Sequence, residues 1–193
     1  MGKREEKAEK TRKKLLGTAD RLINQRGYEN VAVEDITKAC GVAKGTFYNY
    51  FAQKQDLVLA LGQEYFAKVT DKVDELGRLN AREAITEYLL SYIQIIRTKA
   101  NIVLVREWIR YVVIPDNQQQ LKLQFILKGL ERLLTTLSKR GELSNNMSVD
   151  EMARMLMTHF YGVLLMWAVD SSRVIPEDEI KKYCAVQLPA LVR

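Results

Sequence analysis

Val42-Ala43-Lys44-Gly45-Thr46-Phe47-Tyr48-Asn49-Tyr50-Phe51 is the stretch that indicates most strongly how this 193-residue chain folds. On a helix of about 100° per residue, Phe47 and Phe51 lie close together on one face. The opposite face carries small and polar residues: Gly45, Thr46 and Asn49. The pattern predicts a short helix that packs through one face and offers the other to a partner.

The outward residues have the chemistry of a helix that lies in a DNA major groove. Asn49 can bond an adenine edge in two places, and Gly45 and Thr46 let the helix backbone approach the bases closely. Contacts to phosphates are expected from lysine and tyrosine side chains: Lys44, Tyr48, Tyr50 and Lys54. For this stretch alone, an ordinary surface helix with two buried phenylalanines is the alternative.

Two further helices are expected before this stretch. Residues 1–14 are rich in lysine and arginine, and we expect a flexible arm that runs into a first helix, which Gly27 ends in a left-handed cap. A second helix is expected over 33–40, and Gly41 supplies the turn to the third. Residues 10–51 then make a three-helix unit that ends in a helix-turn-helix.

This segment resembles the DNA-binding domain of the tetracycline-repressor (TetR) family. The resemblance is carried by Arg12, Ala19-x-x-Leu22-Ile23, Gly27-Tyr28, Val33-x-Asp35-Ile36, and Gly41 to Phe51 followed by Lys54 and Leu57. Two departures stand out, because Val31 and Ala32 replace the usual Thr or Ser cap of the second helix and Tyr50 replaces a common His. Loss of a capping hydroxyl costs about 1 kcal/mol. The resemblance implies a DNA-binding regulator.

Beyond Lys54 the pattern is helical throughout and gives no sheet signal. The predicted fold class is all-α, with about nine helices in two domains. A helix-turn-helix DNA-binding domain is placed at 1–52, and an effector-binding and dimerisation domain at 53–193. The second domain is expected to contain six helices, over 53–76, from 80 onward, and over 101–113, 115–140, 148–170 and 176–188.

The helix expected over 148–170 is apolar almost all round. A helix of this kind must be buried on all sides, and a partner subunit can cover one of them. With the helix that follows, it resembles the pair through which TetR-family members dimerise as a four-helix bundle. Interface residues are expected among Leu164, Leu165, Ile180, Cys184 and Leu188. A central core helix in a monomer is the alternative.

Aromatic residues collect on the helices that enclose a small-molecule cavity in TetR-family proteins. The candidates for the pocket of an unidentified effector are Tyr88, Tyr92, Trp108, Tyr111 and Phe125. Core packing also uses aromatic residues, but buried hydroxyl and indole groups need partners. His159 lies among apolar residues and is either a hydrogen-bonded core histidine or a polar anchor in the pocket. Arg106 and Arg110 share a helix face that could hold an anion, although a solvated or salt-bridged face is the commoner case.

Composition excludes several other classes. The chain is 47% hydrophobic and 28% charged, with a net charge of +6, of which the first 60 residues contribute four. Two cysteines and one histidine argue against a disulfide framework and a zinc site, and no pattern indicates a nucleophilic catalyst. We expect no catalytic residues, no metal and no cofactor. The charged start and the shortness of the longest apolar runs predict a cytoplasmic protein without a membrane span.

The sequence thus predicts a dimeric repressor that binds a palindromic double-stranded DNA operator and leaves it when a small-molecule effector binds. The alternative is a helical small-molecule carrier or enzyme with a vestigial DNA-binding domain.

Overall fold

The computed structural model describes residues 2–99, 102–113, 119–144 and 147–193. These residues are helical apart from connections and one isolated antiparallel bridge between Leu143 and Val192, which confirms the all-α fold class. The helices are α1 (Lys3–Arg26), α2 (Val33–Cys40), α3 (Lys44–Tyr48), α4 (Asp56–Thr70), α5 (Val73–Leu76), α6 (Ala81–Lys99), α7 (Ile102–Val113), α8 (Gln119–Lys139), α9 (Val149–Val169) and α10 (Pro176–Leu191).

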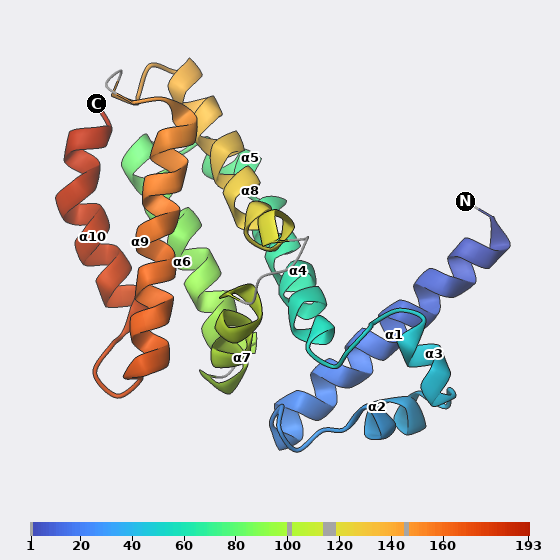
Figure 1. Cartoon of the computed structure of the whole chain (residues 1–193). Helices are drawn as coiled ribbons and strands as arrows, with labels where there is room; N and C mark the ends of the chain where they lie inside the picture. The colour runs from blue at the N-terminus through green and yellow to red at the C-terminus, as the bar shows by residue number, and fades with distance from the viewer. Residues whose placement is uncertain (1, 100–101, 114–118, 145–146) are drawn as a thin grey trace.

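The first three helices form a small unit at one end of the molecule (Figure 1). The basic segment expected to be a flexible arm is helical from Lys3. Gly27 ends α1 with φ +82° and ψ 152°. The positive φ is one that glycine adopts easily, but the conformation differs from the predicted left-handed cap. Gly41 is left-handed, with φ +64° and ψ 38°, and turns the chain from α2 into α3. This turn creates the helix-turn-helix.

Ala32 is the N-cap residue of α2, and its methyl side chain cannot accept a hydrogen bond from the first turn of the helix. The Asp35 carboxylate instead accepts a hydrogen bond from the Ala32 amide at 2.8 Å, and thus satisfies one end of the helix from inside its first turn.

The expected helix over 53–76 is divided, because the chain leaves the helix at Asp71 and Lys72. The described residues therefore contain ten helices where about nine were expected. The first turns of α4 pack into the core of the N-terminal unit through Leu57, Val58 and Leu61, whereas Val69 packs into the core of the larger bundle. One helix thus belongs to two hydrophobic cores. The predicted boundary between 52 and 53 stays a prediction.

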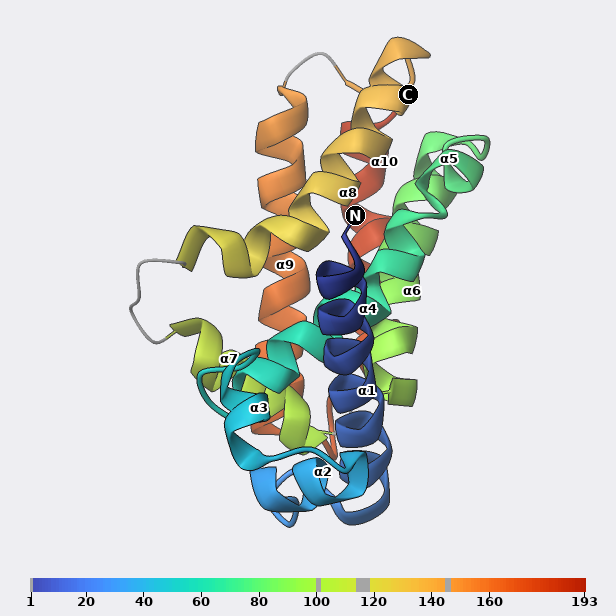
Figure 2. The ribbon, with the colours of Figure 1, turned by 90° about the vertical axis from the view of Figure 1, so that its right-hand side faces the viewer.

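The remaining helices form the larger bundle, with α6 packed against α4, α8 and α10, and α9 packed against α7, α8 and α10 (Figures 1 and 2). Ser148 and Glu151 form a capping box at the start of α9, with each side chain accepting from the other residue's amide. Pro176 occupies the first turn of α10, where its missing amide proton costs no hydrogen bond. Local signals therefore set the ends of α9 and α10.

Helix α9 is long and apolar enough to cross a membrane, with a mean hydropathy of 1.3 over its most apolar window. The continuous apolar runs are short, as the sequence indicates, but the helix as a whole reaches this length and hydropathy. However, 44% of that window is buried inside the protein. Helices α7, α8 and α10 pack against α9, and its first turns carry Asp150, Glu151 and Arg154. Packing against neighbouring helices accounts for the buried part of its apolar composition.

Helices α6 and α8 approach closely where Tyr88 meets Gly129. The buried Tyr88 hydroxyl donates a hydrogen bond to the Ile126 carbonyl at 2.8 Å and lies 3.2 Å from the Tyr92 hydroxyl. A Cβ atom on Gly129 would overlap the Tyr88 hydroxyl oxygen. Because Tyr88 is fully buried and hydrogen-bonded, it has no free space into which to move.

Gly129→Ala is therefore expected to lower the free energy of unfolding by about 2 kcal/mol, since overpacking and the loss of a buried hydrogen bond outweigh the gain of about 1 kcal/mol in helix propensity. Gly17→Ala is the matched control. Gly17 is a helical glycine of α1 with open space around its Cβ position, so alanine there should stabilise the protein. Urea denaturation of both variants measures the difference. A Gly129→Ala protein as stable as Gly17→Ala would show that α6 and α8 do not meet in this way.

Candidate DNA interface and effector pocket

Helix α3 has the two faces that the sequence predicts. Phe47 is fully buried and Phe51 nearly so, and their ring centroids lie 5.3 Å apart. Tyr48 packs its edge on Phe47 but remains 48% exposed. The regular helix ends at Tyr48, yet Asn49 keeps helical backbone angles of φ −72° and ψ −18°, so it continues the outward face.

The outward face of α3 is accessible to a partner. Lys44, Gly45 and Asn49 are exposed, and Thr46 and Tyr50 are half-buried. Lys44 forms an ion pair with Glu34 of α2, in which both side chains are largely exposed. Pairing with Glu34 raises the pKa of Lys44, so this lysine stays charged. A surface pair of this kind contributes little stability, so Lys44 can exchange Glu34 for a phosphate at low cost.

The structure does not support the predicted phosphate contact of Lys54. Its Nζ atom donates a hydrogen bond to the Tyr28 carbonyl at 2.5 Å and lies 3.9 Å from the centre of the Tyr28 ring. Burial lowers the pKa of Lys54. Because the ammonium group is half-buried between a carbonyl and an aromatic face, Lys54 joins the start of α4 to the α1–α2 connection. This is a structural role that a search for basic residues cannot distinguish from phosphate binding.

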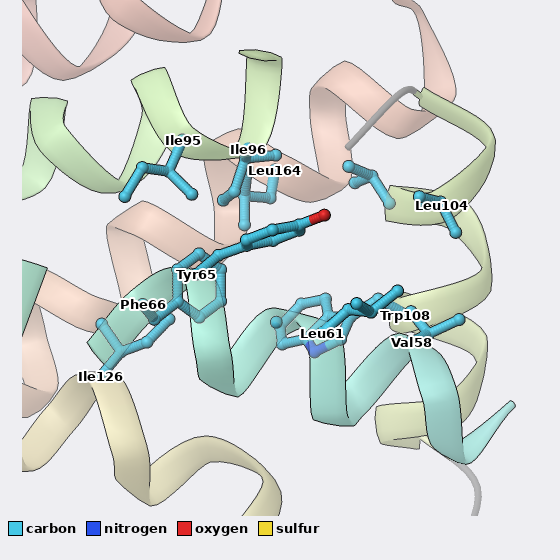
Figure 3. Close-up of a pocket in the computed structure, with 12 residues that line it drawn as sticks. Val58, Leu61, Tyr65, Phe66, Ile95, Ile96, Leu104, Trp108, Ile126 and Leu164 are labelled. Carbon is cyan, nitrogen blue, oxygen red and sulfur yellow. The ribbon is translucent and has the colours of Figure 1, made fainter. Parts of the chain in front are cut away.

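A cavity of about 590 Å³, including its open part, lies between α4 and the helices of the larger bundle (Figure 3). Its lining is almost entirely apolar and consists of Val58, Leu61, Gly62, Tyr65, Phe66, Ile95, Ile96, Leu104, Val105, Trp108, Ile126 and Leu164. Five of these residues come from α4, the helix that also packs into the N-terminal core. The cavity therefore borders the element that connects the two cores.

Among the predicted aromatic residues whose side chains the structure describes, Trp108 alone is found in the lining of the cavity. Tyr88 and Tyr92 are fully buried behind it, where Tyr92 packs on Phe66 at 5.1 Å and its hydroxyl lies 3.2 Å from that of Thr70. These two tyrosines form a hydrogen-bonded core cluster because their hydroxyl groups satisfy each other. The side chains of Tyr111 and Phe125 lie outside the described residues.

His159 faces away from the cavity. Its ring stacks on Tyr183 of α10, with centroids 3.6 Å apart and planes 10° from parallel. Burial lowers the pKa of His159, and Nε2 has no hydrogen-bond partner in the described part of the chain. The histidine is thus part of the contact between α9 and α10 and does not anchor a ligand in this cavity.

The two arginines of α7 are engaged in other contacts. The Arg106 Nε atom donates to the Ala168 carbonyl at the end of α9, at 2.8 Å. Arg110 pairs with the buried Glu107 at 3.3 Å. The salt-bridged alternative to an anion site therefore holds for Arg110.

Most of the residues expected at a dimer interface are buried within the single chain. Leu164, Ile180, Cys184 and Leu188 are each at most 2% exposed, because they face the core between α6, α9 and α10. Leu165 is the exception, at 49% exposed. It lies on the outer side of α9 with Met166 and Val169, which are also exposed. An unpaired apolar strip thus runs along the end of α9.

A comparison with known proteins agrees with the geometry of the N-terminal unit. The model of the bacterial regulatory proteins of the tetR family matches residues 15–61, which contain the helix-turn-helix and the start of α4. Over the whole chain, the fold matches a TetR-family transcriptional repressor, Thermus thermophilus FadR solved with lauroyl-CoA, with a TM-score of 0.78. The N-terminal unit is therefore a DNA-binding domain of the tetR family.

The FadR match covers 92% of this chain and 93% of the other, at 21% identity, and so shows the shared fold. The repressor NemR of Escherichia coli is 33% identical over 81 residues, which is 40% of this chain and 41% of NemR. A fatty acid metabolism regulator of Bacillus subtilis is 23% identical over 82% of this chain and 84% of its own length. The chain therefore aligns with only about two fifths of NemR but with most of the other two proteins.

Sequence reasoning missed that α4 forms a wall of the cavity. Val58, Leu61, Gly62, Tyr65 and Phe66 recur at intervals of three and four along one face of α4. That spacing is present in the sequence, but it equally describes a helix with one core-facing side. Tyr65 and Gly62 were the available signals, since a hydroxyl and a missing side chain are uncommon on a purely structural face.

Proposed function

We propose that this protein is a transcriptional repressor that binds a palindromic DNA operator as a homodimer and is released by an apolar small molecule. The outward face of α3 carries the proposal. Thr46 and Asn49, which we expect to read bases, lie on this face, opposite Phe47 and Phe51 in the core. Lys44, Tyr48 and Tyr50 flank that face and suit phosphates. A protein with this task acts where the DNA is, so we place it in the cytoplasm.

Dimerisation supplies the second half of the proposed DNA interface. One short recognition helix contacts too few bases to select a site, whereas two helices related by a two-fold axis read a palindrome. The exposed Leu165, Met166 and Val169 on α9, with Val186 on α10, offer apolar surface that a second copy would cover. We therefore place the two-fold contact along α9 and α10.

The effector proposed for the cavity is an uncharged apolar molecule or the acyl part of a larger one. Tyr65 is one of twelve lining residues, and the side chains of the other eleven bring no hydroxyl, carboxylate, amide or ammonium group to the space. The indole of Trp108 supplies a flat face. An ionised group buried there would lack a partner, which is costly. The lauroyl-CoA bound to the related FadR structure supports an apolar chain as one such ligand.

The proposal is tested by comparing Asn49→Ala with Lys44→Ala in DNA binding. Loss of Asn49 should relax the preference at one base pair per half-site by about 1–3 kcal/mol. Loss of Lys44 should weaken binding to all sequences alike and flatten the dependence of log K on log salt by about one unit per lost phosphate contact. Fluorescence anisotropy at several salt concentrations, on matched and mismatched duplexes, separates the two effects.

Lys128→Ala, which removes an exposed lysine of α8, is the control and should change neither the preference nor the salt slope. An Asn49→Ala protein with full sequence preference would show that α3 does not present this face to the bases. A wild-type protein that binds an apolar ligand but no DNA would instead be a carrier.

A further inference from the structure

Tyr65 is in contact with both the cavity and the DNA-binding unit. Its ring forms part of the cavity wall, next to Ile96 and Leu164 in Figure 3. Its hydroxyl donates a hydrogen bond to Oδ1 of Asp20, which lies on α1, 45 residues earlier in the chain. Of the residues that line the cavity, Tyr65 is the one that carries a hydroxyl group. A single side chain therefore spans from the ligand space to the first helix.

The contact between Tyr65 and Asp20 has the properties of a specific link. A hydrogen bond to a carboxylate is roughly twice as strong as one between neutral groups. Burial, with the neighbouring Asp20 carboxylate, raises the pKa of Tyr65, so the hydroxyl remains a donor throughout the physiological range. Asn24 donates to the same Asp20 oxygen at 2.6 Å and thereby fixes the carboxylate on α1. The geometry of the acceptor is thus set by α1 itself.

Apart from the Lys54–Tyr28 contact just before α4 begins, the other contacts described between α4 and the N-terminal unit are apolar. Val58 and Leu61 face the cavity and also belong to the N-terminal core. Apolar contacts are non-directional, so a small rotation of α4 leaves them largely intact. A hydrogen bond is lost when its angle or distance changes by a modest amount. The Tyr65–Asp20 bond is therefore the contact most sensitive to movement of the cavity wall.

We propose that Tyr65 couples occupancy of the cavity to DNA binding through Asp20, an inference that rests on the proposed function. A molecule larger than the existing cavity presses on its wall and displaces the Tyr65 ring, which is part of that wall. Displacement carries the hydroxyl away from Asp20 and frees α1 to change its orientation relative to α4. In the empty protein the bond favours the orientation that binds DNA. The ligand releases DNA by as much as it prefers the arrangement without the bond.

The inference is tested by the coupling factor, defined as operator affinity without an apolar probe divided by operator affinity at a saturating concentration of it. The probe is N-phenyl-1-naphthylamine, which is neutral and aromatic and fluoresces in apolar sites. The operator is a palindrome selected from random DNA by the wild-type protein. We expect a factor within the usual range of about 5 to 150 for wild type, and about 2 or less for Tyr65→Phe and Asp20→Ala. A variant that weakens operator binding equally with and without the probe leaves this ratio unchanged. A variant that only weakens probe binding also leaves it unchanged, because the probe is saturating.

Two further variants separate coupling from general damage. Asp20→Asn keeps an oxygen that accepts from Tyr65, so it should retain most of the wild-type factor. Tyr183→Phe removes the hydroxyl of a tyrosine on α10 that stacks on His159, and it should retain the factor in full.

A wild-type factor in Tyr65→Phe would overturn the inference and leave the proposed function standing. A wild-type protein that binds no DNA, or whose DNA affinity the bound probe leaves unchanged, would overturn both.

Discussion

Leu165→Asp is expected to give a folded monomer with at least about 100-fold weaker binding to a palindromic operator. Leu165 is 49% exposed in the single chain, so a carboxylate there costs the monomer little. In the proposed dimer the same carboxylate would be buried without a partner, which costs several kcal/mol. About 3 kcal/mol corresponds to a factor of about 100 in an equilibrium constant. Sedimentation velocity at micromolar concentration, with circular dichroism as a check on folding, measures the outcome.

The neighbouring residue provides a sharp control, since Leu164 is only 2% exposed and packs in the core of the single chain. Leu164→Asp should therefore unfold the larger bundle instead of separating two folded subunits. Adjacent leucines are then predicted to give opposite outcomes. A Leu165→Asp protein that still sediments as a dimer would place the two-fold contact on another surface.

Phe47→Ala is expected to destabilise the DNA-binding unit by about 3–5 kcal/mol, because Phe47 is completely buried against Phe51 and removal of a buried phenylalanine leaves a cavity. Much of the stability of a unit of this size is lost by such a change. Helices α1 to α3 should melt at lower temperature than the larger bundle, and DNA binding should be lost with them. Differential scanning calorimetry should show two transitions in place of one.

Tyr48 is the matched control for this prediction, because it is the next residue in α3 and is about half exposed. Tyr48→Ala should change the free energy of unfolding by less than about 1 kcal/mol, yet weaken DNA binding if its hydroxyl contacts a phosphate. Equal stability of the Phe47→Ala and wild-type proteins would contradict the assignment of the buried face of α3.

Local rules predicted much of this fold because the relevant partners are close in sequence. Phe47 and Phe51 are four residues apart, Ser148 and Glu151 are three apart, and Gly41 acts through its own backbone angles. In each case a short-range pattern leaves few alternative structures. The all-α fold class followed from such patterns repeated along the chain.

Long-range contacts explain why several predicted site residues have other partners in the structure. Lys54 was expected on phosphates, but its partner Tyr28 lies 26 residues away. Tyr88 and Tyr92 were expected in the pocket, but α8 covers them where Gly129 lets it approach. Helical periodicity places Leu164 and Leu165 about 100° apart without saying which of them faces the core. These choices depend on how the helices pack, and the sequence carries no local signal for that.

Selection of DNA from a random library by the wild-type protein tests the central claim most directly. We expect enrichment of a palindrome whose half-sites are separated by about one helical turn of DNA or a multiple of it. This spacing follows because two recognition helices related by a two-fold axis must reach major grooves on the same side of the duplex. Recovery of fragments with no shared sequence, or of a single half-site without a symmetric copy, would contradict it.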